Sequence, residues 1–282
     1  MGLPQAPADL LIALLPPRLL RHVEYVIGRD ERVIVARTWA ELEQMLHIHP
    51  VTVALIDPSA DGASKTVEFE RLAADYPSLA IIAYVPLTPS AFRAVAQLSK
   101  LGLEHVILYS HDDSAERMIA TIDKVRANPL TERFIEALQP QLDRLPLAIS
   151  KVVVEMFAEP HRYPNAQDLA TTANVTIVRL YRAFTAADFA APKKMVVAAK
   201  LLRAYTHLSD PGQSVGGAST KLSYRNPRIF AEHTNEVFGV NPSRLRARVT
   251  ENQLVETLLA WVGKEIPEAD ATMREKRRFG GR

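Results

Sequence analysis

The chain has 282 residues, 48% of them hydrophobic, and a formal net charge of +2. This length exceeds most single hydrophobic cores and predicts about two domains. The absence of cysteine excludes disulfides, thiolate metal sites and a cysteine nucleophile, and the low net charge, taken alone, argues against a nucleic-acid partner.

Short apolar, β-branched runs alternate with longer amphipathic runs between residues 9 and 127. Strands are predicted at residues 10–15, 32–36, 51–56, 79–85 and 105–109, and helices near residues 17–27, 39–47, 65–76, 89–100 and 114–126. Such alternation predicts a parallel sheet with helices on both faces. We therefore expect a doubly wound, five-stranded α/β domain over residues 1–127.

The first apolar run, residues 10–15, is too short to cross a bilayer, and no basic residue precedes it as a secretion signal requires. We interpret it as a buried strand. We expect a cytoplasmic protein without a membrane partner.

The predicted α/β domain resembles receiver-type and flavodoxin-like domains. Receivers carry a phosphoacceptor Asp after the third strand, where this chain has Asp57. The residues that assist phosphorylation in receivers are replaced here by Leu14, Leu15, Pro16 and Pro17 after the first strand, Tyr84 and Val85 after the fourth, and Tyr109 and Ser110 after the fifth. Because phosphoryl transfer needs metal and Lys to neutralise charge, we interpret Asp57 as a turn residue at a vestigial phosphoacceptor position.

Ligand binding by this domain has little sequence support. Fold analogy alone places a small molecule near Asp57 and Tyr84, and no Gly-rich loop follows a strand. His47 and His49 lack a third metal ligand, and no acid, base or nucleophile set converges. We expect no cofactor, no metal and no enzymatic activity. In receivers, the face corresponding to residues 89–126 mediates pairing, which implies a homodimer.

Residues 128–146 form a predicted helical linker interrupted by prolines. The segment 132–145 can form an amphipathic helix, which either bridges domains or protomers or rests on its own domain. A second helix is predicted over residues 147–157. Beyond it, residues 151–250 carry 14 Lys and Arg against 7 Asp and Glu, whereas the rest of the chain carries 20 against 25. The positive charge is therefore concentrated in one region, as phosphate binding requires.

Two segments of this basic region have the pattern of a helix-turn-helix: LATTANVTIVRLYRAF at residues 169–184, and residues 214–246. A predicted helix at residues 191–208 joins them. In the first pair, Leu169 and Ala170 are expected to pack, Thr176 to cap the second helix, and Leu180 and Phe184 to be buried. A further amphipathic helix is predicted near residues 251–263, followed by a basic, flexible tail at residues 264–282.

The two helix pairs resemble the DNA-binding module of AraC/XylS transcription regulators. The second pair of that family ends in an aromatic residue, Gly, Val, a short polar residue and Pro, which correspond here to Phe238, Gly239, Val240, Asn241 and Pro242. The resemblance implies a module over residues 147–263. It also implies DNA contacts by Thr176, Val178, Tyr181, Arg182, Arg225, Asn226 and Arg228. For Tyr181 a role as a half-buried packing residue is an equal alternative.

Several residues depart from the family pattern. Gly216, Gly217 and Ala218 replace an acid and a large aliphatic residue, and each Gly costs about 0.5–1 kcal/mol of helix stability relative to Ala. Ser223 replaces a Gly, Glu232 occupies an often basic site, Thr234 replaces an aromatic residue, and Phe189 replaces a Gly. The fold is expected to persist with a weaker second DNA-reading helix.

These observations predict a sequence-specific, DNA-binding transcription regulator of AraC type whose pseudo-receiver domain serves regulation or dimerisation. The expected partners are double-stranded DNA, a second copy of the chain, and RNA polymerase or another regulator. The alternative is an interaction protein that retains the fold, does not bind DNA and modulates another regulator.

Overall fold

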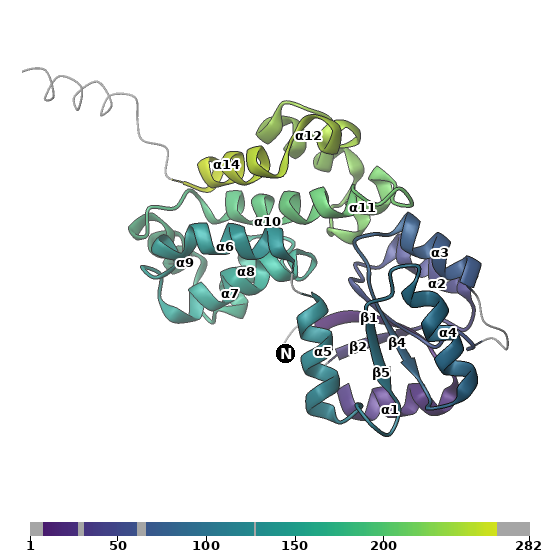
Figure 1. The fold of residues 1–282 in the computed structure, drawn as a ribbon. Coiled ribbons are helices and arrows are strands. Elements are labelled where there is room, and N and C mark those ends of the chain that lie inside the picture. The colour runs from purple at the N-terminus through teal and green to yellow at the C-terminus, as the bar shows by residue number, and fades with distance from the viewer. Residues whose placement is uncertain (1–7, 28–30, 61–65, 127, 264–282) are drawn as a thin grey trace, which may run out of the picture.

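The computed structural model describes residues 8–27, 31–60, 66–126 and 128–263 (Figure 1). Its N-terminal half is an α/β unit, and its C-terminal half is a bundle of helices. The α/β elements are β1 (Ala8–Leu14), α1 (Pro17–Ile27), β2 (Glu31–Val35), α2 (Trp39–Ile48), β3 (Val53–Ile56), α3 (Thr66–Asp75), β4 (Ala80–Val85), α4 (Pro89–Ser99), β5 (His105–Leu108) and α5 (Ala115–Arg126). The five predicted strands and five predicted helices are confirmed, with ends that differ by about two residues at most.

All strand pairs are parallel, and the strand order is β2-β1-β3-β4-β5. The chain runs outward from β1 to β2 and then returns past β1 to β3, so the direction of winding reverses between β1 and β3. This confirms the expected five-stranded parallel sheet.

Helices cover both faces of the sheet because successive strand residues point to opposite sides. Ile12 and Leu14 belong to the core formed with α2, α3 and α4, whereas Leu11 and Ala13 belong to the core formed with α1 and α5. Strands buried on both faces are apolar at nearly every position. That continuous apolar character is the signal that made the strands predictable.

The helical half is organised around one long helix. Its elements are α6 (Pro129–Leu142), α7 (Leu147–Ala158), the 3-10 turn η1 (Pro160–Arg162), α8 (Ala166–Thr172), α9 (Ile177–Ala186), α10 (Pro192–His207), α11 (Val215–Lys221), α12 (Pro227–Phe238), the 3-10 turn η2 (Pro242–Arg244), α13 (Leu245–Arg248) and α14 (Glu251–Val262). In Figure 1, α10 runs through the middle, with α6 to α9 on one side and α12 and α14 on the other. Ala198, Ala199 and Ala204 are buried in α10, and such small side chains allow neighbouring helices to approach.

The helix α6 lies in the segment for which the sequence left two arrangements open: a bridge between domains or protomers, or a helix that rests on its own domain. Phe134, Leu138 and Leu142 form its apolar face and are buried in the core of the helical half. The helix thus packs against other helices of its own half. The predicted final helix is confirmed as α14, whereas the predicted tail at residues 264–282 lies outside the described residues. Within the described ranges, no helix combines the length and apolarity needed to cross a membrane.

The two halves contact each other where the chain passes from α10 to α11. The Gly212 N–H donates to the carbonyl of Asp75, the last residue of α3, at 2.9 Å. A Cβ on Gly212 would lie 2.9 Å from the Tyr76 ring, so only glycine allows this approach. The Tyr76 hydroxyl in turn donates to the Gly212 carbonyl at 3.4 Å. One face of the α/β unit is therefore attached to the segment that leads into the second helix pair.

Candidate nucleic-acid interface

Polar residues cap the N-terminal ends of both helices of the first pair, α8 and α9. Asn165 and Asp168 form a reciprocal capping box at α8. Between the helices, Asn174 adopts a left-handed backbone with φ of 52°, which Asn tolerates better than most residues. The Thr176 hydroxyl then accepts from the Arg179 N–H at 3.2 Å and caps α9. The predicted cap is confirmed, so the Thr176 side chain already serves the helix start.

The helix α9 has one buried and one open face. Leu180 and Phe184 are buried, as expected. On the other side, Val178 is 56% exposed and Tyr181 is 40% exposed, and Arg182 is also exposed. Val178, Tyr181 and Arg182 are spaced i, i+3 and i+4, so they share one face of the helix. Arg179, which sequence reasoning did not select, is exposed on the same helix.

The second pair, α11 and α12, has equivalent caps. The Ser214 hydroxyl accepts from the Gly217 N–H at 3.0 Å at the start of α11, and the side-chain Oδ1 of Asn226 accepts from the Ile229 N–H at 3.0 Å at the start of α12. Ser223 has a positive φ of 55°, a backbone conformation that favours glycine. Its hydroxyl donates to the His161 carbonyl at 3.0 Å, which ties this strained turn to η1.

Arginines at the start of α12 are exposed but not equivalent. Arg225 and Arg228 both lie at the surface. The Arg228 Nε donates to the Glu232 carboxylate at 2.8 Å, across one turn of the helix. Thr234 is fully buried, and its hydroxyl donates to the Phe230 carbonyl at 2.8 Å, so this polar group is paired within the core.

Lys200, a basic residue of α10, is buried. Its ammonium group donates to the carbonyls of Pro164 and Ser223 at 3.3 and 3.4 Å and lies 4.7 Å from the centre of the Tyr224 ring. Burial lowers the pKa of Lys200 to about 8. Because Pro164 precedes α8 and Ser223 precedes α12, this lysine connects the two helix pairs. Its role in this position is structural.

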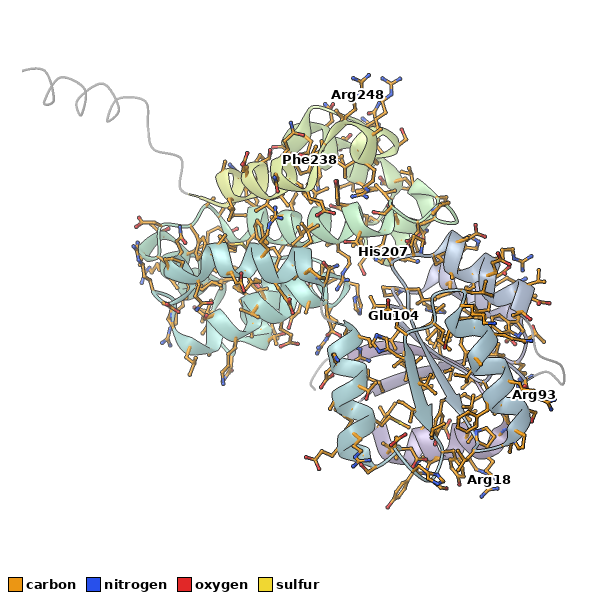
Figure 2. All side chains as sticks on the ribbon, viewed as in Figure 1. Arg18, Arg93, Glu104, His207, Phe238 and Arg248 are labelled. Atoms are coloured by element: carbon orange, nitrogen blue, oxygen red, sulfur yellow. The ribbon has the colours of Figure 1, made fainter. Side chains whose placement is uncertain are left out.

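The site residues expected from the sequence form two separate groups. In Figure 1, α9 lies near the start of α10, and α12 lies on the opposite side of α10, toward its other end. Further arginines, Arg244 and Arg248, line a hollow with Asn241 beyond the end of α12. Figure 2 shows Arg248 at the outer tip of the helical half. Sequence reasoning missed these two, although their R-x-R-x-R spacing was a visible signal.

Asp57 lies in a turn after β3. Its carboxylate accepts from the Ser59 N–H at 2.8 Å, which confirms the predicted turn role. Burial raises the pKa of Asp57, and the hydrogen bond from Ser59 opposes that shift.

A buried network that the sequence did not reveal lies at the ends of β4 and β5. The Tyr84 hydroxyl donates to the Asp113 carboxylate at 2.7 Å, the Ser110 N–H donates to the same oxygen at 2.9 Å, and His22 Nε2 lies 3.2 Å from it. Burial opposes ionisation of Asp113, yet the bonds from Ser110 and Tyr84 bring its pKa below the usual value. The Tyr84 side chain is therefore part of the core. It does not face the edge of the sheet where fold analogy placed a small molecule.

No family model, curated protein or solved structure matches this chain.

Proposed function

We propose that the chain is a sequence-specific DNA-binding transcription regulator of AraC type. The observation that carries the proposal is the open face of α9, where Val178, Tyr181 and Arg182 are exposed together on a capped helix that follows a short turn. An arginine on such a face can bond guanine or a phosphate, and an exposed valine can contact a thymine methyl group.

The second helix pair supplies the other half of the proposed reader. Arg225, Asn226 and Arg228 lie at the N-terminal end of α12, the end that recognition helices direct at base edges. Two readers in one chain would contact successive major-groove segments about one helical turn apart. Affinity would come mainly from phosphate contacts and fall with salt.

We assign the α/β half the role of a pseudo-receiver. Its strand order is one that receiver-type and flavodoxin-like sheets use, which supports the fold assignment. The residues around Asp57 lack the chemistry for phosphorylation, so regulation would act through contacts. Phe92 on α4, Val106 on β5 and Ile119 on α5 are exposed apolar residues, which supports homodimerisation through this face.

A non-DNA-binding interaction protein is the second candidate. It is favoured by the Arg228–Glu232 ion pair, which places negative charge beside the proposed phosphate contacts, and by the use of the Asn226 side chain as a cap. Another regulator would then be the partner.

The deciding experiment is recovery of genomic DNA fragments bound to the purified full-length protein at two salt concentrations. Enrichment of one motif with two half-sites supports the regulator. Binding without a motif, or no binding, contradicts it and favours the interaction protein. Affinity for the recovered motif, measured by mobility shift, then provides the baseline for variants.

A further inference from the structure

The helix α11 packs directly against α2 of the α/β unit. In Figure 1, α11 lies beside α2 and α3, whereas α9 lies at the opposite end of the bundle. Among the described residues, no hydrogen bond or ion pair joins α8 or α9 to the α/β unit. Of the two helix pairs, the α/β unit is therefore attached to the second.

The sequence of α11 does little to stabilise its own helix. The helix has seven residues, and two of them are Gly216 and Gly217. Isolated helices of this length are marginal in water, and glycine lowers helix stability further. The placement of α11 therefore depends on the segments that pack against it.

Contacts with the ends of α2 and α3 hold the start of α11. A Cβ on Gly217 would lie 3.2 Å from the carbonyl of His47, in the last turn of α2. The absence of a side chain at Gly217 thus allows the two backbones to approach closely. Just before the helix, Gly212 donates to the Asp75 carbonyl and accepts from the Tyr76 hydroxyl.

The last residue of α11, Lys221, is held at the same junction. It is only 3% exposed, and its ammonium nitrogen lies 5.9 Å from the centre of the Tyr76 ring. Burial lowers the pKa of Lys221 to about 8, and the Asp210 carboxylate opposes that shift. Asp210 in turn accepts hydrogen bonds from the backbone and the hydroxyl of Ser78. Tyr76 and Ser78 therefore connect both ends of α11 to the α/β unit.

The turn after α11 carries this placement to α12. The Tyr224 N–H donates to the Ser219 carbonyl of α11 at 3.1 Å, and the Tyr224 ring lies 5.2 Å from the ring of Phe230 in α12. Arg225 and Asn226 directly follow Tyr224 and begin α12. A displacement of α11 would therefore move the start of α12.

We propose that the α/β unit is a positioning element for the second helix pair. By holding α11, the positioning residues Tyr76 and Ser78 set the placement of α12 relative to α9. This inference rests on the proposed function, because it gives α12 the role of a DNA reader. It assigns the influence of the α/β unit to the half-site read by α12 and not to the half-site read by α9.

Hydrogen exchange of the full-length protein tests whether the α/β unit holds α11. The double variant Tyr76→Phe, Ser78→Ala removes two hydroxyls from the junction and changes no residue of the helical half. Because one of them bonds a carboxylate, amides of α11 and the start of α12 should exchange about tenfold faster, and those of α8 and α9 at the wild-type rate. Equal changes in the two helix pairs would overturn the proposal.

A matched control and a second variant complete this test. Tyr25→Phe with Ser59→Ala removes the same two hydroxyls from exposed positions of the α/β unit and should leave exchange unchanged. Gly212→Val adds bulk against the Tyr76 ring from the helical side and should accelerate exchange in the same helices as the double variant. Unchanged exchange of α11 in both junction variants would overturn the proposal.

Mobility shifts on the recovered motif test the consequence for DNA reading. Each half-site is scrambled in turn, and the loss of discrimination in Arg182→Ala identifies the half-site read by α9. In the Tyr76→Phe, Ser78→Ala variant, scrambling the other half-site should cost less affinity than in the wild type, by about threefold or more. Scrambling the half-site of α9 should cost the same in both proteins.

The two experiments separate failure of the inference from failure of the proposed function. An equal loss of affinity for all duplexes, or no change, would overturn the positioning role while the regulator stands. If the wild type binds no motif, the proposed function is wrong and the role of α12 as a reader fails with it. Hydrogen exchange shows independently whether the α/β unit holds α11.

Discussion

The Asp210 carboxylate accepts two hydrogen bonds from Ser78: the backbone N–H donates to Oδ1 at 2.9 Å and the hydroxyl donates to Oδ2 at 2.5 Å. Asp210 follows α10, and Ser78 lies between α3 and β4. This buried contact joins the two halves of the chain.

Asp210→Ala should therefore destabilise the junction. We expect a loss of about 1.5–3 kcal/mol in the free energy of unfolding, the range for hydrogen bonds to a charged group. Denaturant unfolding can follow each half, because one tryptophan, Trp39, lies in α2 and the other, Trp261, in α14. Trp39→Phe and Trp261→Phe backgrounds isolate the two signals. Ser78→Ala, which removes only the hydroxyl, should cost less, and an equal cost would contradict the role given to the carboxylate.

Two adjacent glycines in α11 should respond to alanine in opposite directions. A Cβ on Gly217 would meet the Gln213 side-chain amide and lie 3.2 Å from the His47 carbonyl of α2, so Gly217→Ala should destabilise the protein by about 1–3 kcal/mol. A Cβ on Gly216 has no neighbour closer than 3.9 Å, so Gly216→Ala should stabilise the helix by about 0.5–1 kcal/mol. Thermal unfolding of the two variants measures both effects. Equal shifts of the melting temperature in the two variants would contradict the close packing of α11 on α2.

The open face of α9 predicts the effect of Arg182→Ala. If Arg182 reads a base in the recovered motif, the variant should lose about 1–3 kcal/mol of specific binding and discriminate less at one position. Arg21→Ala provides the control, since Arg21 is exposed on α1, far from the helical half in Figure 1. Mobility shifts on the motif and on a scrambled duplex measure both quantities. An affinity equal to that of the control would remove Arg182 from the site.

The Arg228–Glu232 ion pair predicts a gain of affinity. Glu232→Gln removes a negative charge from the exposed face of α12 and releases Arg228 for a phosphate. We expect tighter binding to all duplexes and a steeper dependence of affinity on salt. Arg228→Ala in the same assay should act in the reverse direction. If neither substitution changes the salt dependence, Arg228 does not contact a phosphate.

Buried histidines predict lower stability in acid. The pKa of His161 is about 4 in the folded chain and 6.5 in the reference state, so the unfolded chain binds more protons between these values. The stability associated with neutral His161 is therefore complete above pH 6.5 and is lost as pH falls toward 4. His207 shifts in the same direction. Urea unfolding between pH 7 and 5 measures how the free energy of unfolding depends on pH. In His161→Phe the slope of that dependence should be shallower than in the wild type by up to about 1.4 kcal/mol per pH unit. An unchanged slope would contradict the buried, neutral state of His161.

Local patterns were sufficient to predict most elements of the fold. The continuous apolar run from Leu11 to Leu14, and a cap such as Thr176, depend on a few neighbouring residues and can be recognised in the sequence. The outward position of Val178 and Tyr181 followed from the helical spacing of Leu180 and Phe184. By contrast, the sequence did not predict the burial of Lys200, because that burial depends on distant turns at Pro164 and Ser223.

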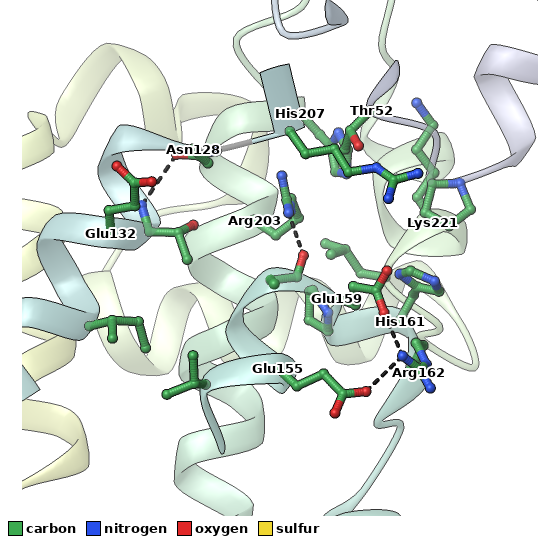
Figure 3. Close-up of a pocket in the computed structure, with 18 of the residues that line it drawn as sticks. Thr52, Asn128, Glu132, Glu155, Glu159, His161, Arg162, Arg203, His207 and Lys221 are labelled. Atoms are coloured by element: carbon green, nitrogen blue, oxygen red, sulfur yellow. Dashed lines mark hydrogen bonds and ion pairs between the residues drawn. The ribbon is translucent and has the colours of Figure 1, made fainter. Parts of the chain in front are cut away.

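The sequence alone determined the parallel sheet, the helical C-terminal half and the polar cap at the start of α9, because periodicity and capping depend on near neighbours. Only the tertiary structure decided which residues form the junction and its cavity. Ser78 and Asp210 are 132 positions apart, and neither has a distinctive local pattern. His161, Arg203, His207 and Lys221 line one cavity at this junction (Figure 3), because η1, α10 and α11 pack together there. The shifted pKa values of His161, His207 and Lys221 depend on that packing, because desolvation acts on a side chain only once distant segments cover it.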